Sequence, residues 1–585
     1  MNINLSDKPF NLNQTQIEWV KKTFSSMTLE EKIGQLFCTS ISDFTSEIVN
    51  HLTKDIKVGG LMIRPFPVKN LQKNLRNLQN ASRLPLLISA NLESGGNGAI
   101  EEGTIFNMPE GCSATGDIEN GYRLGKISCQ EAASVGVNWG YAPIVDIDLN
   151  YRNPITNIRT FGNNRDMVIK MARGYIKAAK EEGIAPTIKH FPGDGVDERD
   201  QHLLVSVNSL SYDEWIQSYG HIYKTLIKEG APVVMAAHIA QPAVAREIDP
   251  SISDYDAFLP ASLSKTLTTG FLRNNINFNG LIVTDSTLMM GFMEKMPRRQ
   301  AVPQAIESGC DVLLFNRNID EDFAYMTEGY QKGILSDKRL NEAVLRILGL
   351  KASMNLHIKH QNGKIVPDVD PMSIINSPLT KKWVEECADK AVTLVKDNRD
   401  LLPLSPKKTK RIYLNVIENY VSNDSKFAEN IKNRLEKEGF VVELRKRELD
   451  FNPNLLLEGI ITPSIANVMK EVQATTEDFV SKYDLCLIVV NMETVSNSTV
   501  IRINWKVMMG LGNDLPWYSG EIPLVVISTA NPYHLLDIPM AHAYINTYTN
   551  NKETLDAVFN KLAGRSKFKG ISPVDPFCGH EDCGL

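Results

Sequence analysis

The sequence predicts an α/β protein built from an N-terminal (β/α)8 TIM-like barrel and a C-terminal α/β sandwich domain. Its 585 residues exceed what one hydrophobic core usually holds, so two domains are expected. Short apolar runs alternate with amphipathic helical segments between residues 15 and 350, which is the pattern of repeated strand–helix units. A polar stretch that contains prolines then precedes a second, shorter alternation of the same kind.

The barrel is expected over residues 1–354, with strands marked by short apolar runs. Amphipathic stretches at 167–182, 212–228 and 301–307 supply helices between them. About eight strand–helix pairs suit a closed barrel, with an open doubly wound sheet as the alternative. The strand runs are 59–63, 84–89, 138–143, 185–190, 232–238, 280–285 and 312–315, and 33–38 fits either an eighth strand or the end of a helix.

Polar residues follow the carboxyl ends of many of these strands. In a parallel barrel those ends converge on one rim, which is where barrel enzymes hold their active sites. The pattern therefore favours the closed barrel and predicts a functional site at that rim. The residues concerned are Asn91, Glu93, Asp146, Lys189, His190, His238 and Asp285.

The second domain is expected over residues 380–585, after a linker at 355–379 that carries three prolines. A helix should open it, and the length that remains suffices for a separate domain. Its expected strands are 411–416, 440–444, 485–490, 524–528 and 543–547, with helices at 425–438, 475–483 and 552–562.

The composition argues against several functions. A net charge of −6 provides no basic surface for nucleic acid, and no segment has the roughly 18 apolar residues of a membrane helix. The N-terminus lacks the pattern of a signal peptide, which predicts a cytoplasmic location. The eight cysteines are scattered and are expected to be reduced. Cys578 and Cys583 are a weak signal for a metal or a disulfide, and an ordered or frayed tail is favoured.

The most informative motif is Lys189-His190-Phe191-Pro192-Gly193-Asp194-Gly195, followed by Asp200-Gln201-His202. It follows an expected strand, so its charged side chains lie at a carboxyl end. On such a loop Asp200 can hold one ring nitrogen of His202 and leave the other free to move a proton. A hydrogen bond that merely orders the turn is the structural alternative. A metal site is disfavoured, because these loop-borne side chains lack a regular ligand spacing.

Asp285 ends the apolar run Gly280–Thr284. A carboxylate delivered by a barrel strand to the rim is suited to nucleophilic catalysis. The alternative is that Asp285 caps a helix that follows the strand.

Several motifs, taken in order, resemble glycoside hydrolase family 3, and within it the β-N-acetylglucosaminidase branch. The resemblance covers nearly the whole chain, and the agreement of order and spacing makes it specific. It is carried by Thr28–Leu36, Arg159-Thr160-Phe161-Gly162, the Lys189–Gly193 loop with Asp200-Gln201-His202, Pro260–Ser264 with Leu272-Arg273 and Gly280–Asp285, and Ala391–Lys396 with Leu401–Leu404.

The resemblance implies a role for each candidate residue. Asp285 is the expected nucleophile, and His202, oriented by Asp200, is the expected acid/base. An imidazole titrates near neutral pH and, as a neutral base, does not repel an anionic acceptor. The sugar contacts implied by the resemblance are Asn91, Glu93, Arg159, Lys189, His190 and His238.

Three positions depart from the family pattern. Asn91 stands where the family usually has Asp, which puts selectivity between gluco and galacto sugars in doubt. Asp194 stands in place of a His and is expected near the leaving group, where it would repel acidic aglycones. Gln201 replaces a Ser inside the dyad motif and, because it should point away from the dyad, is expected to matter little.

Together these features predict a retaining, exo-acting β-N-acetylglucosaminidase that releases terminal N-acetylhexosamine from saccharides such as chitin or muropeptide fragments, in cell-wall recycling. No cofactor or metal is expected, because two protein groups supply acid and nucleophile. Three alternatives stay open: a phosphorylase of β-glucosides or N-acetylglucosaminides on the same scaffold, a β-glucosidase, and a catalytically silent sugar-binding protein. The oligomeric state is left open.

Overall fold

The computed structural model describes residues 3–375, 377–420, 422–446, 453–494, 496–503, 505, 507–508, 511–512 and 515–585. Contacts divide the chain into two compact units. Unit 1 holds the residues up to Ser113, Asp117–Val384 and the short downstream segment Ser496–Thr499. Unit 2 holds Ala114–Gly116, Glu385–Val495 and Val500–Leu585.

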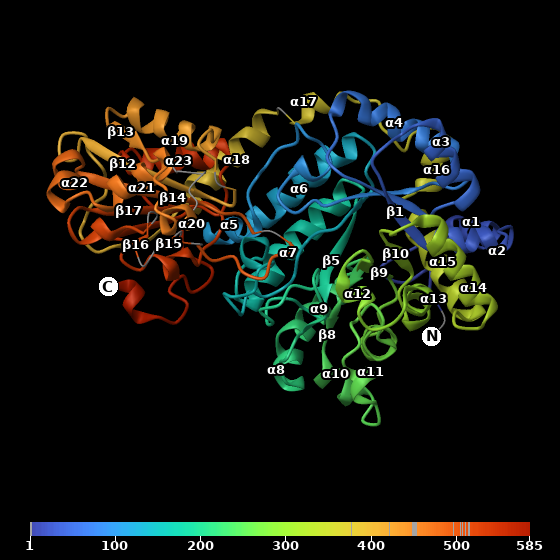
Figure 1. Ribbon diagram of the computed structural model, residues 1–585. Coiled ribbons are helices and arrows are strands. Elements are labelled where there is room, and N and C mark those ends of the chain that lie inside the picture. The colour runs from blue at the N-terminus through green and yellow to red at the C-terminus, as the bar shows by residue number, and fades with distance from the viewer. Residues whose placement is uncertain are drawn as a thin grey trace. The chain divides into compact units, whose positions relative to one another are not determined.

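Unit 1 is a closed barrel of parallel strands, which confirms the barrel over the open sheet (Figure 1). The strands close in the order β1-β10-β9-β7-β5-β4-β3-β2. Each expected run overlaps a strand, and the ambiguous run 33–38 spans the end of helix α2 and the start of β1. The strands are β1 (Phe37–Ile41), β2 (Gly60–Ile63), β3 (Leu87–Ala90), β4 (Trp139–Gly140), β5 (Ala185–Phe191), β7 (Val233–Ala236), β9 (Leu281–Ser286) and β10 (Val312–Leu314).

Helices surround the barrel because their apolar stripes need a sheet to cover. In α4, for example, Leu71, Leu75 and Leu78 recur at helical spacing and are all buried. The helices of unit 1 include α1 (Gln14–Ser25), α2 (Leu29–Gln35), α3 (Ser46–Asn50), α4 (Val68–Ala81), α6 (Glu119–Ser134), α7 (Arg165–Glu181), α8 (Tyr212–Gln217), α9 (Tyr219–Lys228), α10 (Pro242–Ile248), α11 (Asp254–Ala257), η4 (Thr266–Asn275), α12 (Met290–Met293), α13 (Arg298–Ser308), α14 (Ile319–Gln331) and α15 (Asp337–Ser353).

The segment expected as a linker, 355–379, is more structured than its prolines indicate. It carries the short helices α16 (Leu356–Gln361) and α17 (Pro371–Ile375), and contacts assign it to unit 1. Helix α18 (Pro378–Ala391) follows at the expected place, and the division between the units falls within it.

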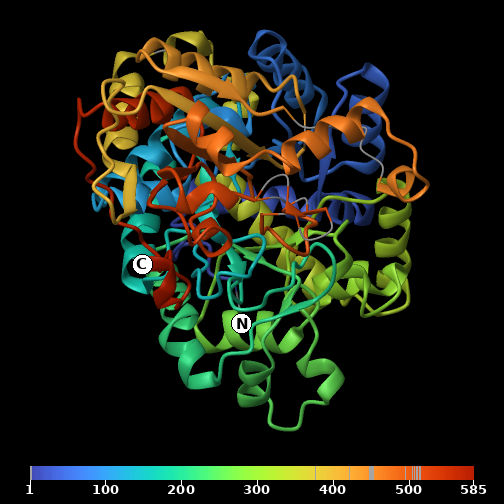
Figure 2. The ribbon, with the colours of Figure 1, turned by 60° about the vertical axis from the view of Figure 1, so that its left-hand side comes forward.

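Unit 2 is built on a six-stranded sheet (Figure 2). Apolar clusters lie on both faces of this sheet. Alternate residues of β12 and β14 supply the two clusters, as strand geometry requires. The expected strands are found, and the antiparallel edge strand β11 is an addition. The order is β11 (Thr393–Asp397), β18 (Ala543–Asn546), β17 (Leu524–Ser528), β14 (Leu485–Asn491), β12 (Arg411–Glu418) and β13 (Val441–Leu444), with helices α19 (Lys426–Lys437), α21 (Pro463–Val472), α22 (Thr476–Lys482) and α23 (Lys552–Leu562).

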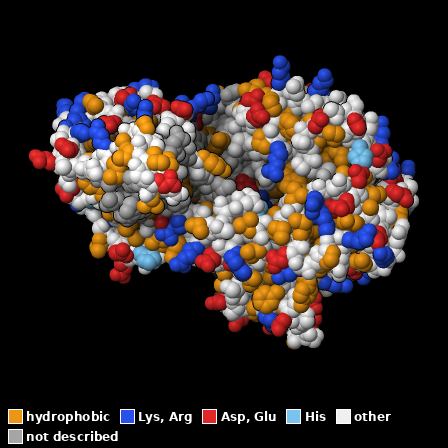
Figure 3. Space-filling model, viewed as in Figure 1, with side chains coloured by type: hydrophobic (Ala, Val, Ile, Leu, Met, Phe, Trp, Pro, Cys, Tyr) orange, Lys and Arg blue, Asp and Glu red, His pale blue; other side chains and the backbone are white. Residues whose placement is uncertain are grey.

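The surface and the tail agree with the composition. Basic and acidic side chains are interspersed over the face seen in Figure 3. Within the described part of the chain, no helix is both long and apolar enough to cross a bilayer. Cys578 and Cys583 form no disulfide among the described residues, and Cys583 is buried in an apolar cluster of unit 2, so this part of the tail is packed.

Candidate active site

The barrel gathers the predicted site residues at its carboxyl-terminal rim. Asn91 and Glu93 follow β3, Lys189 and His190 lie at the end of β5, and Asp285 lies in β9. Because all the barrel strands are parallel, these ends meet at one rim. Arg159 follows β4 in a short helical turn, Asp200 and His202 lie in the loop after β5, and His238 comes two residues after β7.

Glu93 is the centre of a partly buried ion cluster. Arg159 Nε and Nη2 each donate to it at 2.9 Å, and Lys189 Nζ donates at 2.6 Å. Burial by itself would raise the pKa of Glu93, but the two cations outweigh burial and hold it well below its usual range. The three side chains are therefore all charged and fixed, and Lys189 keeps further N–H groups for a ligand.

His190 is held by Asp146. The sequence places Asp146 after a strand but indicates no function for it. The Nδ1 atom of His190 lies 2.6 Å from Asp146 Oδ2, and its backbone N–H donates to Oδ1 at 3.1 Å. Both side chains are buried. A carboxylate that accepts from Nδ1 fixes the ring and leaves Nε2 to face a ligand. The pairing joins the ends of two neighbouring barrel strands, β4 and β5, and the two residues are 44 positions apart in the chain, so local spacing could not reveal it.

The expected Asp200–His202 pair is present. Asp200 Oδ1 accepts from the ring Nδ1 of His202 at 2.6 Å and from its backbone N–H at 2.8 Å. Asp200 is fully buried at its side chain, whereas that of His202 is 26% exposed. Burial would raise the pKa of Asp200, but the hydrogen bond and charge of His202 outweigh it, so the pKa is lowered. The pair therefore presents a carboxylate-backed imidazole to solvent.

A backbone amide from far downstream completes this pair. Asn497 lies in the segment Ser496–Thr499 that belongs to unit 1, and its N–H donates to Asp200 Oδ2 at 2.7 Å. The contact stabilises the ionised form of Asp200. No sequence signal near the dyad motif indicated it, because about 300 residues separate the two partners.

Asp285 is an ionised carboxylate at the end of a barrel strand. Burial would raise its pKa, but nearby imidazoles, His190 foremost, and the backbone N–H of Ser286 lower it. That N–H donates to Oδ1 at 2.7 Å, which leaves Oδ2 for chemistry. An ionised carboxylate is the form that a nucleophile needs.

The loop that carries Asp200 and His202 is tied to the segment after β9 and to the segment after β7. The carbonyl oxygen of His202 accepts from the backbone N–H of Met290, just beyond β9, at 3.0 Å. The short strands β6 (Ser206–Val207) and β8 (Ile239–Ala240) pair in parallel and hold the loop to the segment after β7. These links bring His202 and Asp285 to the same part of the rim.

Gln201 supplies a third tie, so it does more in the fold than the sequence indicates. Its side chain is 1% exposed. Oε1 accepts from the backbone N–H of His238 at 2.9 Å, and Nε2 donates to Asp194 Oδ2 at 3.4 Å. Gln201 does point away from the dyad, as expected, but it points into a buried network that fixes the loop.

Asp194 is also placed differently from the expectation. It is 3% exposed and accepts from Asn153 Nδ2 at 2.9 Å, so it faces the protein interior and is not poised to repel an aglycone. Burial, with the nearby charge of Asp146, raises the pKa of Asp194 to about 6. Its carboxyl organises the loop from within.

His238 reaches the rim, but both its ring nitrogens are occupied. Nδ1 lies 2.9 Å from Ser262 Oγ, and Nε2 lies 2.9 Å from the carbonyl oxygen of Ser286. Burial lowers the pKa of His238 to about 4, so the ring is neutral near pH 7 and donates from Nε2. These bonds let His238 position Ser286, next to Asp285, while its sugar contact stays a prediction.

Comparison with models of known protein families identifies the family of this chain. Residues 28–350 match the family model described as glycosyl hydrolase family 3 N terminal domain. The chain belongs to glycoside hydrolase family 3. It is therefore a glycoside hydrolase of the barrel-plus-sheet type that acts on saccharides.

Two relatives match nearly the full length of the chain, and a third matches about half of it. A β-N-acetylglucosaminidase/β-glucosidase from Cellulomonas fimi is 39% identical over 588 residues, which covers 100% of both chains. A solved structure named β-glucoside phosphorylase BglX is 44% identical, with a TM-score of 0.89 over 99% of both chains. β-Hexosaminidase A from Pseudoalteromonas piscicida is 27% identical over 345 residues, 56% of each chain.

Proposed function

We propose that this enzyme cleaves terminal β-linked N-acetylglucosaminides by a double displacement that retains anomeric configuration. The observation that carries the proposal is the pairing, on one part of the rim, of an ionised Asp285 with an exposed imidazole backed by a buried carboxylate. Chitin or muropeptide fragments are the saccharides we expect it to accept. The name of the Cellulomonas relative supports this sugar and also admits glucosides.

In the first step Asp285 Oδ2 attacks the anomeric carbon, and the bond from that carbon to the leaving oxygen breaks. His202, protonated and held by Asp200, donates its Nε2 proton to that oxygen. In the second step neutral His202 takes a proton from water, whose oxygen displaces Asp285 from the sugar. Asp200 stabilises the imidazolium and keeps Nε2 outward throughout.

The remaining rim residues suit a polar sugar. Lys189 and His190 have donors left after their bonds to Glu93 and Asp146, and Arg159 completes the ion cluster. Asn91 is partly exposed beside them in sequence, after the same strand as Glu93. We assign these side chains to the hydroxyl groups of the sugar, which has many donors and acceptors to satisfy.

Phosphorolysis is the second candidate, and two observations favour it. The 44% identical structure is named a β-glucoside phosphorylase. A neutral imidazole at the acid/base position, unlike a carboxylate, does not repel phosphate. In this version a phosphate oxygen attacks the anomeric carbon of the intermediate, Asp285 leaves, and the product is a sugar 1-phosphate.

One experiment separates these outcomes. Aryl β-glucoside and aryl β-N-acetylglucosaminide are turned over in phosphate and in a phosphate-free buffer, with free sugar and sugar 1-phosphate measured separately. Hydrolysis gives free sugar in both buffers, whereas phosphorolysis gives sugar 1-phosphate at a rate that rises with phosphate.

The covalent step is tested with a 2-fluoro sugar and mass spectrometry. An inverted product, or no added mass on the peptide that contains Asp285, contradicts the mechanism.

A further inference from the structure

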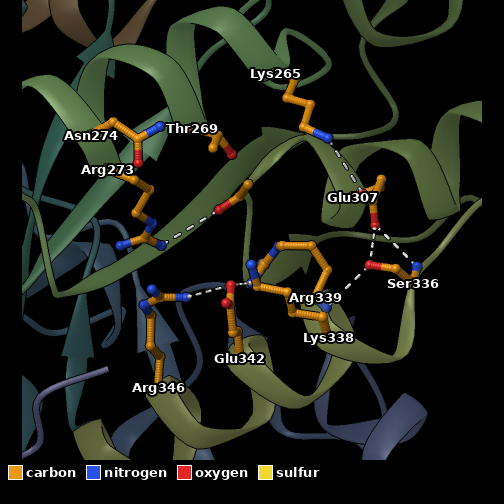
Figure 4. Close-up of a pocket in the computed structure, with 11 residues that line it drawn as sticks. Lys265, Thr269, Arg273, Asn274, Glu307, Ser336, Lys338, Arg339, Glu342 and Arg346 are labelled. Carbon is orange, nitrogen blue, oxygen red and sulfur yellow. Dashed lines mark hydrogen bonds and ion pairs between the residues drawn. The ribbon is translucent and has the colours of Figure 1, made fainter. Parts of the chain in front are cut away.

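A polar pocket lies at the end of the barrel opposite the rim that holds the candidate active site. Its volume is about 280 Å³. Gly309 and Arg273, which line it, lie beside the amino-terminal ends of β10 and β9, and helix α15 supplies another wall. The rim that holds Asp285 is at the carboxyl ends of the same strands. Figure 4 shows that basic side chains from several elements line this pocket: Lys265, Arg273, Lys338, Arg339 and Arg346.

The three arginines surround one buried carboxylate, that of Asp311. Asp311 has no exposed surface, and it accepts from Arg273 Nη2 at 2.6 Å and from Arg339 Nη2 at 2.9 Å. Arg346 Nη1 lies farther away, at 3.4 Å. Guanidinium groups are always charged in practice, so this cluster holds more positive charge than Asp311 neutralises.

Two glutamates in the pocket do not remove the surplus. Glu342 lies 3.2 Å from Arg339 and 3.9 Å from Arg346. Glu307 lies 3.7 Å from Lys265 but accepts its shorter hydrogen bonds from Ser336, at 2.8 and 3.0 Å. Within the described residues, five basic groups thus face three carboxylates.

Two further observations indicate a missing anion. Arg346 is 3% exposed, yet its Nε has no hydrogen-bond partner among the described residues. Burial and the neighbouring Arg346 lower the pKa of Arg273 to about 9, which is the response expected when cations crowd together. An unpartnered buried donor in a basic cavity is costly unless a ligand accepts from it.

We propose that this pocket binds a small tetrahedral oxyanion, that is, a phosphate group, either as inorganic phosphate or on a phosphorylated sugar. Planar guanidinium forks match the oxygens of a phosphate, and the exposed Lys265 and Lys338 add charge at the mouth. The volume lies just below the range of pockets that hold drug-sized ligands, so it suits a group of this size. The site is separate from the catalytic rim and does not depend on the proposed reaction.

Titration calorimetry on the full-length enzyme tests the proposal with inorganic phosphate, glucose 6-phosphate and glucose. Both lysines at the mouth are exposed, so the double variant Lys265→Gln/Lys338→Gln should fold normally. Lys21→Gln, on the exposed face of α1, is the matched control. The double variant is expected to weaken phosphate binding about tenfold or more, as the loss of charged contacts does, and the control to leave it unchanged.

The two phosphate sources are separated by affinity. Tighter binding of glucose 6-phosphate than of inorganic phosphate, with no binding of glucose, points to a phosphorylated sugar, and the reverse order points to the free ion. A phosphate-binding event that the double variant leaves intact belongs to the catalytic rim and overturns the proposal. Absence of binding at millimolar phosphate overturns it as well.

Discussion

The two ends of the barrel balance buried charge in different ways. At the rim, His190 and His202 each bond to a carboxylate of their own, and Glu93 serves two cations. At the amino-terminal end of the barrel, which we call the base, three arginines surround Asp311, and two of them also lie near Glu342. An imidazole beside a carboxylate can gain a proton at little electrostatic cost, because the carboxylate stabilises the positive charge. At the base, five basic groups face three carboxylates among the described residues, so positive charge is in excess there.

Asp285→Asn is expected to reduce activity more than any of the other substitutions. The amide cannot form the glycosyl-enzyme bond, so turnover should fall by about 10⁴-fold or more, the scale seen when a covalent nucleophile is removed. Steady-state kinetics on an aryl N-acetylglucosaminide measure the loss, and thermal unfolding checks that the fold is intact. Residual turnover within about tenfold of the wild type would exclude Asp285 as the nucleophile.

His202→Ala tests the proton donor at the same rim. We expect a loss of roughly 10²–10⁴-fold on substrates with poor leaving groups, because these need protonation, and a much smaller loss on activated aryl glycosides. A series of aryl glycosides of graded leaving-group pKa measures the difference in slope. Equal losses across the series would show that His202 does not protonate the leaving group.

Arg273→Met and Arg346→Met test whether the arginine cluster at the base holds more positive charge than its carboxylates neutralise. Removal of Arg273 breaks the 2.6 Å contact to Asp311 and should cost about 3–5 kcal/mol of stability, as for a broken buried ion pair. Removal of Arg346 should cost clearly less, because Asp311 keeps two closer cations and the crowding is relieved. Urea unfolding compares the pair, and turnover per folded molecule should be unchanged in both. Equal destabilisation would show that the base carries no surplus.

Much of this arrangement follows from sequence patterns, and the limits are physical. The barrel strands, Asp285 and the Asp200–His202 pair were predictable because each rests on a periodic run or on a spacing of two residues. The partner of His190, the amide of Asn497 and the tie from Gln201 to His238 were not, because each joins residues that are 37 or more positions apart in the chain. Asp194 was misjudged for the same reason: sequence placed it on a polar loop, whereas the fold buries it against Asn153.

Asp194→Asn tests that buried carboxyl through its pH dependence. The folded-state pKa of Asp194 is raised from 3.8 to about 6, so folding favours the protonated form. The wild type therefore loses stability as pH rises through this window, by up to about 3 kcal/mol. The Asn variant lacks the loss, so its stability relative to wild type should increase between pH 4 and pH 7. Urea unfolding at the two pH values measures it, and a constant difference would show that folding does not shift the pKa of Asp194.

The smallest expected effect concerns sugar selectivity at Asn91. Asn91→Asp supplies the carboxylate that sequence comparison with the family led us to expect, and a charged acceptor binds a hydroxyl more strongly than an amide does. We expect the preference for gluco over galacto substrates, taken as a ratio of kcat/KM values, to rise about tenfold, the worth of one charged hydrogen bond. Lys189 and Arg159 stay paired with Glu93 in the variant, so their contacts serve as a constant background. An unchanged ratio would place Asn91 outside the set of residues that contact the sugar, and would move the origin of selectivity to the Glu93 cluster and His190.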